Sequence, residues 1–249
     1  MRATRVDNRG FGKRLGEHYA VLRFAPVWWH WRRSPPWAGF GEPLNGQSTR
    51  QTVIRRLIGL FEPDVIVETG TFLGDTTRWL AQLGVPVVSV ELEPAFFRLA
   101  KRRLRGASDV ELICGASVDA LAMLARRPNV SRPLLYLDAH WREGNPRNED
   151  EANPLGEEVA AVLSAWADAL IVIDDFLVPT DPGYGYDTSR GKPLSEAMLE
   201  LPDDAVVAYP STPATIESGG RRGAAFIGRG AEARKAIRTL SSEGLLSEV

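Results

Sequence analysis

The sequence predicts an α/β fold, a doubly wound sheet of seven mostly parallel strands with an antiparallel last strand. Runs of β-branched and apolar residues, typical of strands buried on both faces, alternate with segments long enough for crossover helices. The first run ends in a glycine turn and the next ends in an acid roughly 20 residues later, as a strand-helix-strand unit requires. The expected strands lie near 65–69, 87–91, 110–117, 134–138, 170–175, 205–209 and 223–228.

Before the first strand, the apolar pattern from Val53 to Phe61 predicts a helix, with Ser48 as its N-cap. The Asn-Gly turn just before it predicts either a plain turn or part of a lid that presents Gln47 to a ligand. No repeats or low-complexity segments interrupt the chain.

After the fifth strand, residues 178–187 are rich in turn formers and tyrosine, which predicts a long loop suited to stacking on a substrate. A helix is expected near 192–201. Two further strands, near 205–209 and 223–228, should follow it. A final helix should run from Ala231 to about Leu240, with Gly244 as its stop.

The turn after the first strand carries the strongest functional signal. Gly70 and Gly74 lack a Cβ, so the backbone can turn sharply and approach a ligand, while Thr76 and Thr77 begin a helix with free N–H groups. Glu91, at the end of the second strand, is placed to accept both hydroxyls of a ribose. These residues predict a nucleotide-cofactor site. The alternative is a tight turn that only joins strand to helix.

The loop has two glycines and not the three of a dinucleotide fingerprint, and Glu68 beside it would repel a pyrophosphate but suits a cationic ligand. The stretch from Glu68 to Gly74 matches the acid-x-Gly-x-x-x-Gly motif of the class I S-adenosylmethionine-dependent methyltransferases, which the chain resembles from about residue 45 to about 230. The resemblance implies a Rossmann-like fold whose last two strands form an antiparallel pair that closes the sheet. It also implies S-adenosylmethionine as cofactor. The expected cofactor-binding residues are Glu68, Thr69, Gly70, Thr71, Gly74, Thr76, Thr77, Glu91, Ala116 and Ser117.

Carboxylates follow the fourth and fifth strands, where parallel strands bring their ends together. Asp138, Asp174 and Asp175 would repel one another unless a cation intervenes, and oxygen ligands in that number favour Mg²⁺. The pattern is most similar to the metal-dependent, macrocin-type sugar O-methyltransferases. The ion would bind the acceptor hydroxyl, lower its pKa and align it with the methyl group. Alternatively, each Asp caps the helix that follows it.

The expected catalytic residues are Asp138, through the ion, and His140, two residues further on. A histidine can take the proton that a sugar or phenol hydroxyl loses, so His140 is a candidate general base or substrate-orienting group. Related metal-dependent enzymes tend to have Lys or His three residues after the metal Asp, where this chain has Trp141. A histidine that bonds only to backbone, or sits beside the metal, is the alternative.

Residues 1–44 are expected to form a basic, tryptophan-rich arm or lid on a methyltransferase domain of residues 45–249. The first fifty residues carry nine Lys and Arg against three acids, and four of the seven tryptophans. Because the remainder of the chain is acidic, we expect the arm to dock on the body or on a second subunit, giving a homodimer. An anionic membrane surface is an alternative partner. Nucleic acid is disfavoured because the basic residues are few and scattered.

Bulk composition agrees with one soluble enzyme domain: 249 residues, 44% hydrophobic and 25% charged. The single cysteine, Cys114, is expected to pack in a core strand, and three histidines leave no structural zinc site. No apolar run long enough to span a membrane and no secretory signal are found, so a cytoplasmic location is expected.

The function predicted is divalent-metal-assisted O-methyl transfer from S-adenosylmethionine to a small-molecule hydroxyl acceptor, such as a sugar-containing natural product. One rival is another nucleotide-cofactor enzyme such as a dehydrogenase, which would need a third glycine. The other is a methyltransferase-like protein that binds cofactor or acts as a scaffold without transfer activity.

Overall fold

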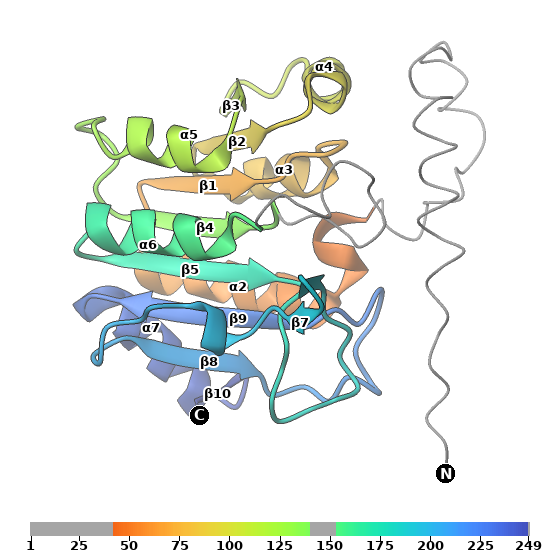
Figure 1. The fold of residues 1–249 in the computed structure, drawn as a ribbon, viewed down its shortest axis with the longest axis vertical. Helices are drawn as coiled ribbons and strands as arrows, with labels where there is room; N and C mark the ends of the chain where they lie inside the picture. Colours follow the sequence, from red (N-terminus) through yellow and green to blue (C-terminus); the bar gives the residue numbers. More distant parts are fainter. Residues whose placement is uncertain (1–41, 140–152, 249) are drawn as a thin grey trace.

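The computed structural model describes residues 42–139 and 153–248, which form an α/β fold around an eight-stranded sheet (Figure 1). The strand order is β10-β8-β9-β5-β4-β1-β2-β3. Strands β1 to β5 run parallel to their neighbours among themselves, while β9 is antiparallel to β5 and β8, and β10 is antiparallel to β8. The strands are β1 (Val65–Thr69), β2 (Val87–Glu91), β3 (Val110–Cys114), β4 (Pro133–Leu137), β5 (Ala169–Asp174), β8 (Val206–Pro210), β9 (Ala224–Arg229) and β10 (Leu246–Glu248).

The predicted fold class is therefore confirmed, including the antiparallel pair β8 and β9, and the strand count is corrected from seven to eight. The extra strand is β10, whose three residues pair with the outer edge of β8. A strand this short carries no periodic pattern of its own, so only its pairing partner defines it.

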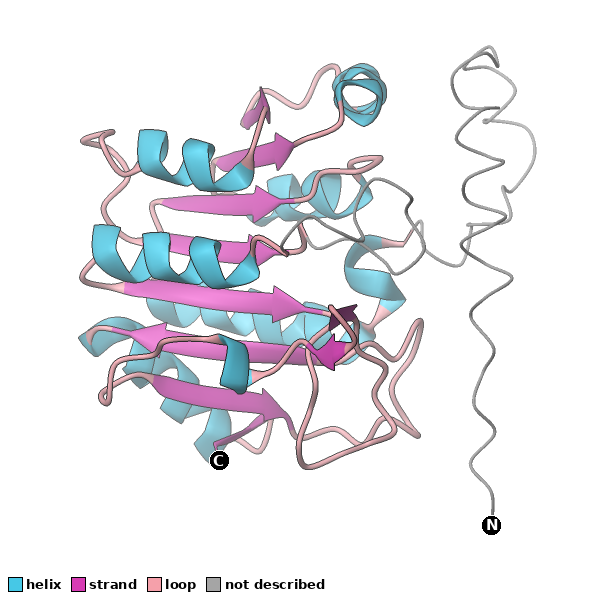
Figure 2. Cartoon of the chain, viewed as in Figure 1, coloured by secondary structure: helices cyan, strands magenta, loops and turns pink. Residues whose placement is uncertain are grey.

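Helices cover both faces of the sheet, α5 and α6 on one face and α2, α3 and α7 on the other (Figure 2). The α-helices are α2 (Ser48–Phe61), α3 (Asp75–Leu80), α4 (Pro94–Arg103), α5 (Ser117–Leu124), α6 (Leu155–Ala165) and α7 (Ala231–Ser242). Short 3-10 turns occupy η3 (Pro43–Gly46), η4 (Ala81–Leu83) and η5 (Glu196–Met198).

Two apolar cores result, one on each face of the sheet. Along β1, Val65 and Val67 belong to the core beneath α5 and α6, whereas Ile66 belongs to the core beneath α2 and α7. Every residue of β1 is buried, because a parallel strand with helices on both faces has no side toward water. This explains why the strand runs are continuously apolar.

Three local expectations were wrong. The segment predicted as a helix near 192–201 contains β7 (Lys192–Pro193), paired with β6 (Thr188–Ser189), and the short turn η5. Tertiary contacts override helix propensity there, since the main chain of Leu194 bonds to that of Leu177 and of Asp187. Ser48 is the first residue of α2 and Gln47 is the N-cap.

The third error concerns Cys114, which is exposed and does not pack in the core. It ends β3, the strand at the outer edge of the sheet, and the residues of β3 are only partly buried or exposed. An apolar sequence run does not reveal that its strand lies at an edge.

The order of connection reverses between β1 and β4, the neighbours at the centre of the sheet. In open α/β sheets, ligands bind outside the carboxyl ends of the strands at such a point. In Figure 1 these ends lie at the right, where η3 and the beginning of α2 are also found. Among the described helices, none has the length and apolar character needed to cross a membrane. The predicted arm, apart from its last residues, lies outside the described residues.

Candidate functional site

The turn after β1 is shaped by two glycines in the left-handed region, Gly70 with φ 85° and Gly74 with φ 77°. A Cβ on Gly70 would lie 2.4 Å from the main-chain oxygen of Asp138, and one on Gly74 would lie 3.0 Å from Cδ1 of Leu104. Both positions therefore require glycine because of backbone conformation and close packing within the chain. This close packing within the chain is a reason for glycine that is independent of the ligand approach that the sequence predicts.

Glu68 lies beneath this turn in a buried cluster of hydroxyl groups. Its side chain is 1% exposed, and Oε2 accepts hydrogen bonds from the hydroxyls of Thr77 and Ser89. The Thr71 hydroxyl in turn bonds to Ser89 at 2.6 Å. Burial, only partly opposed by the two donated hydrogen bonds, raises the pKa of Glu68 to about 7. The cluster joins β1, β2 and α3 just below the glycine turn.

Glu91, the last residue of β2, is fixed beside the same turn. Its Oε2 accepts the main-chain N–H of Phe72 at 2.7 Å, and Oε1 accepts that of Glu93 at 2.8 Å. Burial raises the pKa of Glu91. A carboxylate has about four lone-pair sites, so these two oxygens retain capacity for a further donor such as a ribose hydroxyl.

The other expected cofactor residues surround these two acids. Ala116 is the N-cap of α5 and Ser117 its buried first residue, both just beyond β3. The Thr76 hydroxyl accepts the N–H of Leu44 at 3.2 Å, so that side chain fastens η3. The structure thus places the expected residues at the carboxyl ends of β1, β2 and β3. The side chains of Thr76 and Thr77, however, bond within the protein.

Asp174, the last residue of β5, is 1% exposed and accepts four hydrogen bonds from the protein. Its Oδ1 is paired with Arg50 and accepts the N–H of Asp175 at 2.7 Å. Its Oδ2 accepts the hydroxyl of Tyr136 and the amide of Asn45, the latter at 2.9 Å. Burial, with the neighbouring carboxylate second, raises the pKa of Tyr136, so its hydroxyl remains a donor.

Asp175 has a φ of 52°, a left-handed conformation that tertiary contacts must hold. It forms an ion pair with Nε of Arg222, whose Nη2 is paired with Asp187. Asp138 follows β4, is partly buried, and its N–H donates to the carbonyl of Thr69 at 3.1 Å. The proposed base His140 lies outside the described residues.

These carboxylates do not fit a divalent cation. The four lone-pair sites of Asp174 already accept four protein donors, and Asp175 carries a guanidinium partner. Within 42–139 and 153–248, no three His, Cys, Asp or Glu residues are grouped as metal ligands would be. Of the three expected ligands Asp138, Asp174 and Asp175, the last two are therefore paired with arginines.

Arg50 and Arg222, the cations that reach these aspartates, are not among the site residues expected from the sequence. One signal was available for Arg50: it is buried with Val53, Ile54 and Leu57 on the inner face of α2. A charged residue in that periodic apolar pattern requires a buried partner. Nothing in the glycine-rich segment around Arg222 indicates a partner.

The expected acceptor loop lies just beyond β5. Tyr184 is buried and its hydroxyl donates to the carbonyl of Thr212 at 2.8 Å, so it is structural. Tyr186 is 39% exposed. Of the two tyrosines, only Tyr186 therefore offers ring surface to a ligand.

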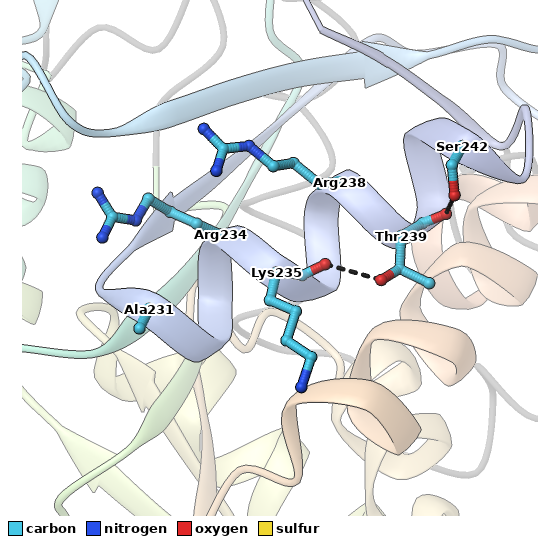
Figure 3. A pocket seen from close by; sticks show the side chains of 6 residues that line it. All are labelled: Ala231, Arg234, Lys235, Arg238, Thr239 and Ser242. Atoms are coloured by element: carbon cyan, nitrogen blue, oxygen red, sulfur yellow. Dashed lines mark hydrogen bonds between the residues drawn. The ribbon is translucent and has the colours of Figure 1, made fainter.

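A separate open pocket of about 500 Å³ runs along α7 (Figure 3). Its three cations each have an acidic partner: Arg234 pairs with Asp204, Lys235 with Glu232 and Arg238 with Glu248. The hydroxyls of Thr239 and Ser242 donate to carbonyls of the same helix. With its polar groups engaged, this pocket is a surface groove without a functional signature.

No protein-family model and no curated protein matches the chain. Among solved structures, the chain is similar to the O-methyltransferase TomG from Streptomyces achromogenes, involved in tomaymycin synthesis and solved with SAM. The identity is 20% over 73% of this chain and 80% of that chain, with a TM-score of 0.47. It is also similar to an O-methyltransferase from Bacillus cereus in complex with SAH, at 15% identity over 91% and 93%, with a TM-score of 0.48.

With identities of at most 20% and TM-scores below 0.5, these likenesses are too distant to assign an activity to the chain. The case for a function therefore depends on the site at the carboxyl ends of β1, β2 and β3.

Proposed function

We propose that the protein binds S-adenosylmethionine and transfers its methyl group to a hydroxyl of a small molecule. One observation carries this proposal. The carboxylate of Glu91 is fixed by two main-chain N–H groups beside the glycine turn of β1, next to the point where the strand order reverses. A carboxylate fixed at this point supports ribose binding, because ligands of open α/β sheets collect at the carboxyl ends of the strands.

The bound cofactor supplies an electrophilic methyl group on a sulfonium. The chain's own part is binding and orientation. Glu91 would accept a ribose hydroxyl with its remaining lone-pair capacity. The backbone at 115–117, just beyond the neighbouring strand β3, would lie beside the adenine. Glu68 and its hydroxyl partners keep the glycine turn in register with β2.

We further propose that the acceptor is a hydroxyl of a sugar-containing or other small natural product. The loop after β5 and the exposed ring of Tyr186 support this class, because aromatic rings stack on sugars and on aromatic acceptors. The macrocin-type, metal-assisted form of the reaction is not part of the proposal, because the carboxylates after β5 do not fit the ion.

The test is isothermal titration of S-adenosylmethionine and its demethylated product into the wild-type protein, Glu91→Gln and Glu93→Gln. Glu93→Gln is the charge-matched control, because it removes a neighbouring carboxylate but keeps the main-chain N–H that donates to the Glu91 carboxylate. We expect micromolar binding by wild type and Glu93→Gln, and a loss of about tenfold or more in Glu91→Gln, equivalent to about 1.4 kcal/mol. Absence of wild-type binding, or equal affinity in Glu91→Gln, would contradict the proposal.

Transfer itself is tested with a panel of hydroxylated sugars and phenols and a labelled methyl donor. Methylated product supports the enzyme. Cofactor binding without any product across the panel favours instead a methyltransferase-like binding or scaffold protein.

A further inference from the structure

The end of β5 is the meeting point of three segments that lie far apart in the sequence. The segment 43–50 contributes Asn45 and Arg50 to Asp174. The segment 217–223 contributes Arg222 to Asp175, and the segment 184–187 contributes Asp187 to the same arginine. Two guanidinium groups thus connect three carboxylates.

The main chains of these segments are also bonded to one another. The N–H of Gly220 donates to the carbonyl of Asn45 at 2.7 Å, and that of Asp187 donates to the carbonyl of Asp175 at 2.8 Å. The N–H of Gly223 donates to the carbonyl of Gly185 at 2.7 Å. A Cβ on Gly219 would lie 2.2 Å from the Asn45 oxygen, so the segments are in close contact.

Arginine suits this place because its planar fork binds two acceptors at fixed angles and it stays charged when buried. Arg222 uses Nε for Asp175 and Nη2 for Asp187, while Arg50 uses Nη1 for Asp174 and Nη2 for the carbonyl of Arg222. A divalent cation at Asp174 would have to displace donors that are already desolvated.

We propose that Arg50 and Arg222 take the place of a divalent cation at the end of β5 and hold these segments as a fixed arginine clasp. The clasp comprises Arg50, Arg222, Asp174, Asp175 and Asp187. With the clasp in place, the segments at the end of β5 stay ordered without any metal ion. The inference concerns the folded chain itself and does not depend on the proposed methyl transfer.

Amide hydrogen exchange distinguishes the two ways of holding the segments. The probes are the amides of Gly185, Asp187 and Gly223, which bond between the segments. If the arginines hold them, EDTA leaves exchange in the full-length wild-type protein unchanged, whereas Arg222→Gln accelerates it about tenfold or more at these amides. Faster exchange in wild type with EDTA, reversed by Mg²⁺, would overturn the proposal.

Two further variants sharpen this experiment. Arg221→Gln is the matched control, because the hydrogen bond found for the Arg221 guanidinium among the described residues goes to the carbonyl of Glu217. This substitution should leave the three probe amides unchanged. Arg222→Lys keeps the charge but loses the planar guanidinium that binds two acceptors, so its probe amides should be better protected than in Arg222→Gln and less protected than in wild type. Equal exchange in Arg222→Gln and Arg221→Gln would overturn the proposal.

Direct metal binding provides a second, independent measurement. Mn²⁺ is titrated into wild type, Asp174→Asn and Asp138→Asn, and free ion is counted by electron paramagnetic resonance. We expect the wild type to bind no more Mn²⁺ than Asp174→Asn or Asp138→Asn. Stoichiometric binding that is lost in Asp138→Asn, whose side chain is only partly buried, would overturn the proposal even if Asp174→Asn failed to fold.

Discussion

Replacing Glu68 by Gln should change how the stability of the protein depends on pH. In the folded chain, burial raises the pKa of this carboxyl from 4.5 to about 7. Below pH 4.5 the group is protonated in both the folded and unfolded chains. Between pH 4.5 and about 7 the unfolded chain loses its proton while the folded chain keeps it, so the free energy of unfolding falls as pH rises.

The magnitude follows from the size of the shift. At 1.36 kcal/mol for each pKa unit, wild type should lose about 3 kcal/mol of stability from this one group by about pH 8. Glu68→Gln keeps an oxygen that can accept from Thr77 and Ser89 but carries no proton to lose. Its stability should therefore lack this decline.

The assay is urea unfolding of both proteins at several pH values between 4.5 and about 8. Titrating groups that are not coupled to Glu68 contribute equally to both proteins, so the difference between the two profiles reports Glu68 together with its coupling to Glu91. Parallel profiles would refute the reasoning, because they would mean that the buried carboxyl titrates as it does in the unfolded chain.

Three further predictions concern stability measured by chemical unfolding. Gly70→Ala should destabilise by more than about 1 kcal/mol because of its left-handed φ and a clash with main chain, whereas Gly59→Ala, with nothing within 4 Å, should stabilise by about 0.5–1 kcal/mol. The reverse order would contradict this. Asp174→Ala should cost about 3–5 kcal/mol by leaving Arg50 charged and buried, and a wild-type stability would argue against the ion pair. Glu111→Ala removes the ion pair with Arg127, in which the Glu111 side chain is 46% exposed. It should lower the free energy of unfolding by less than about 1 kcal/mol.

The parallel strands could be predicted because each is an apolar run buried on both faces, and local sequence determines that pattern. The closing pair β8 and β9 is expected from the resemblance to the class I methyltransferases, whose sheets end in two antiparallel strands, and the structure has that pair. The segment 192–201 could not be assigned correctly, since Leu194 is fixed by main-chain bonds to residues distant in sequence. Propensity does not contain that information.

In the candidate site, too, some features follow from the local sequence and others only from tertiary folding. The position of Glu91 beside the glycine turn follows from strand order alone, and the structure places it there. The placement of Asp138 after β4, and of Asp174 and Asp175 at the end of β5, follows as well. Which cation neutralises them does not, because Arg50 and Arg222 are 172 residues apart and meet only through tertiary folding.

The exposed position of Cys114 gives the protein a built-in reporter. It is the only thiol in the chain and lies in register with Glu91 on the neighbouring strand. A single fluorophore or spin label can therefore be attached one strand away from the proposed ribose contact without removing any other cysteine. Occupancy beside Glu91 can then be followed as a change in labelling rate or in the label's signal, with no need to know the acceptor.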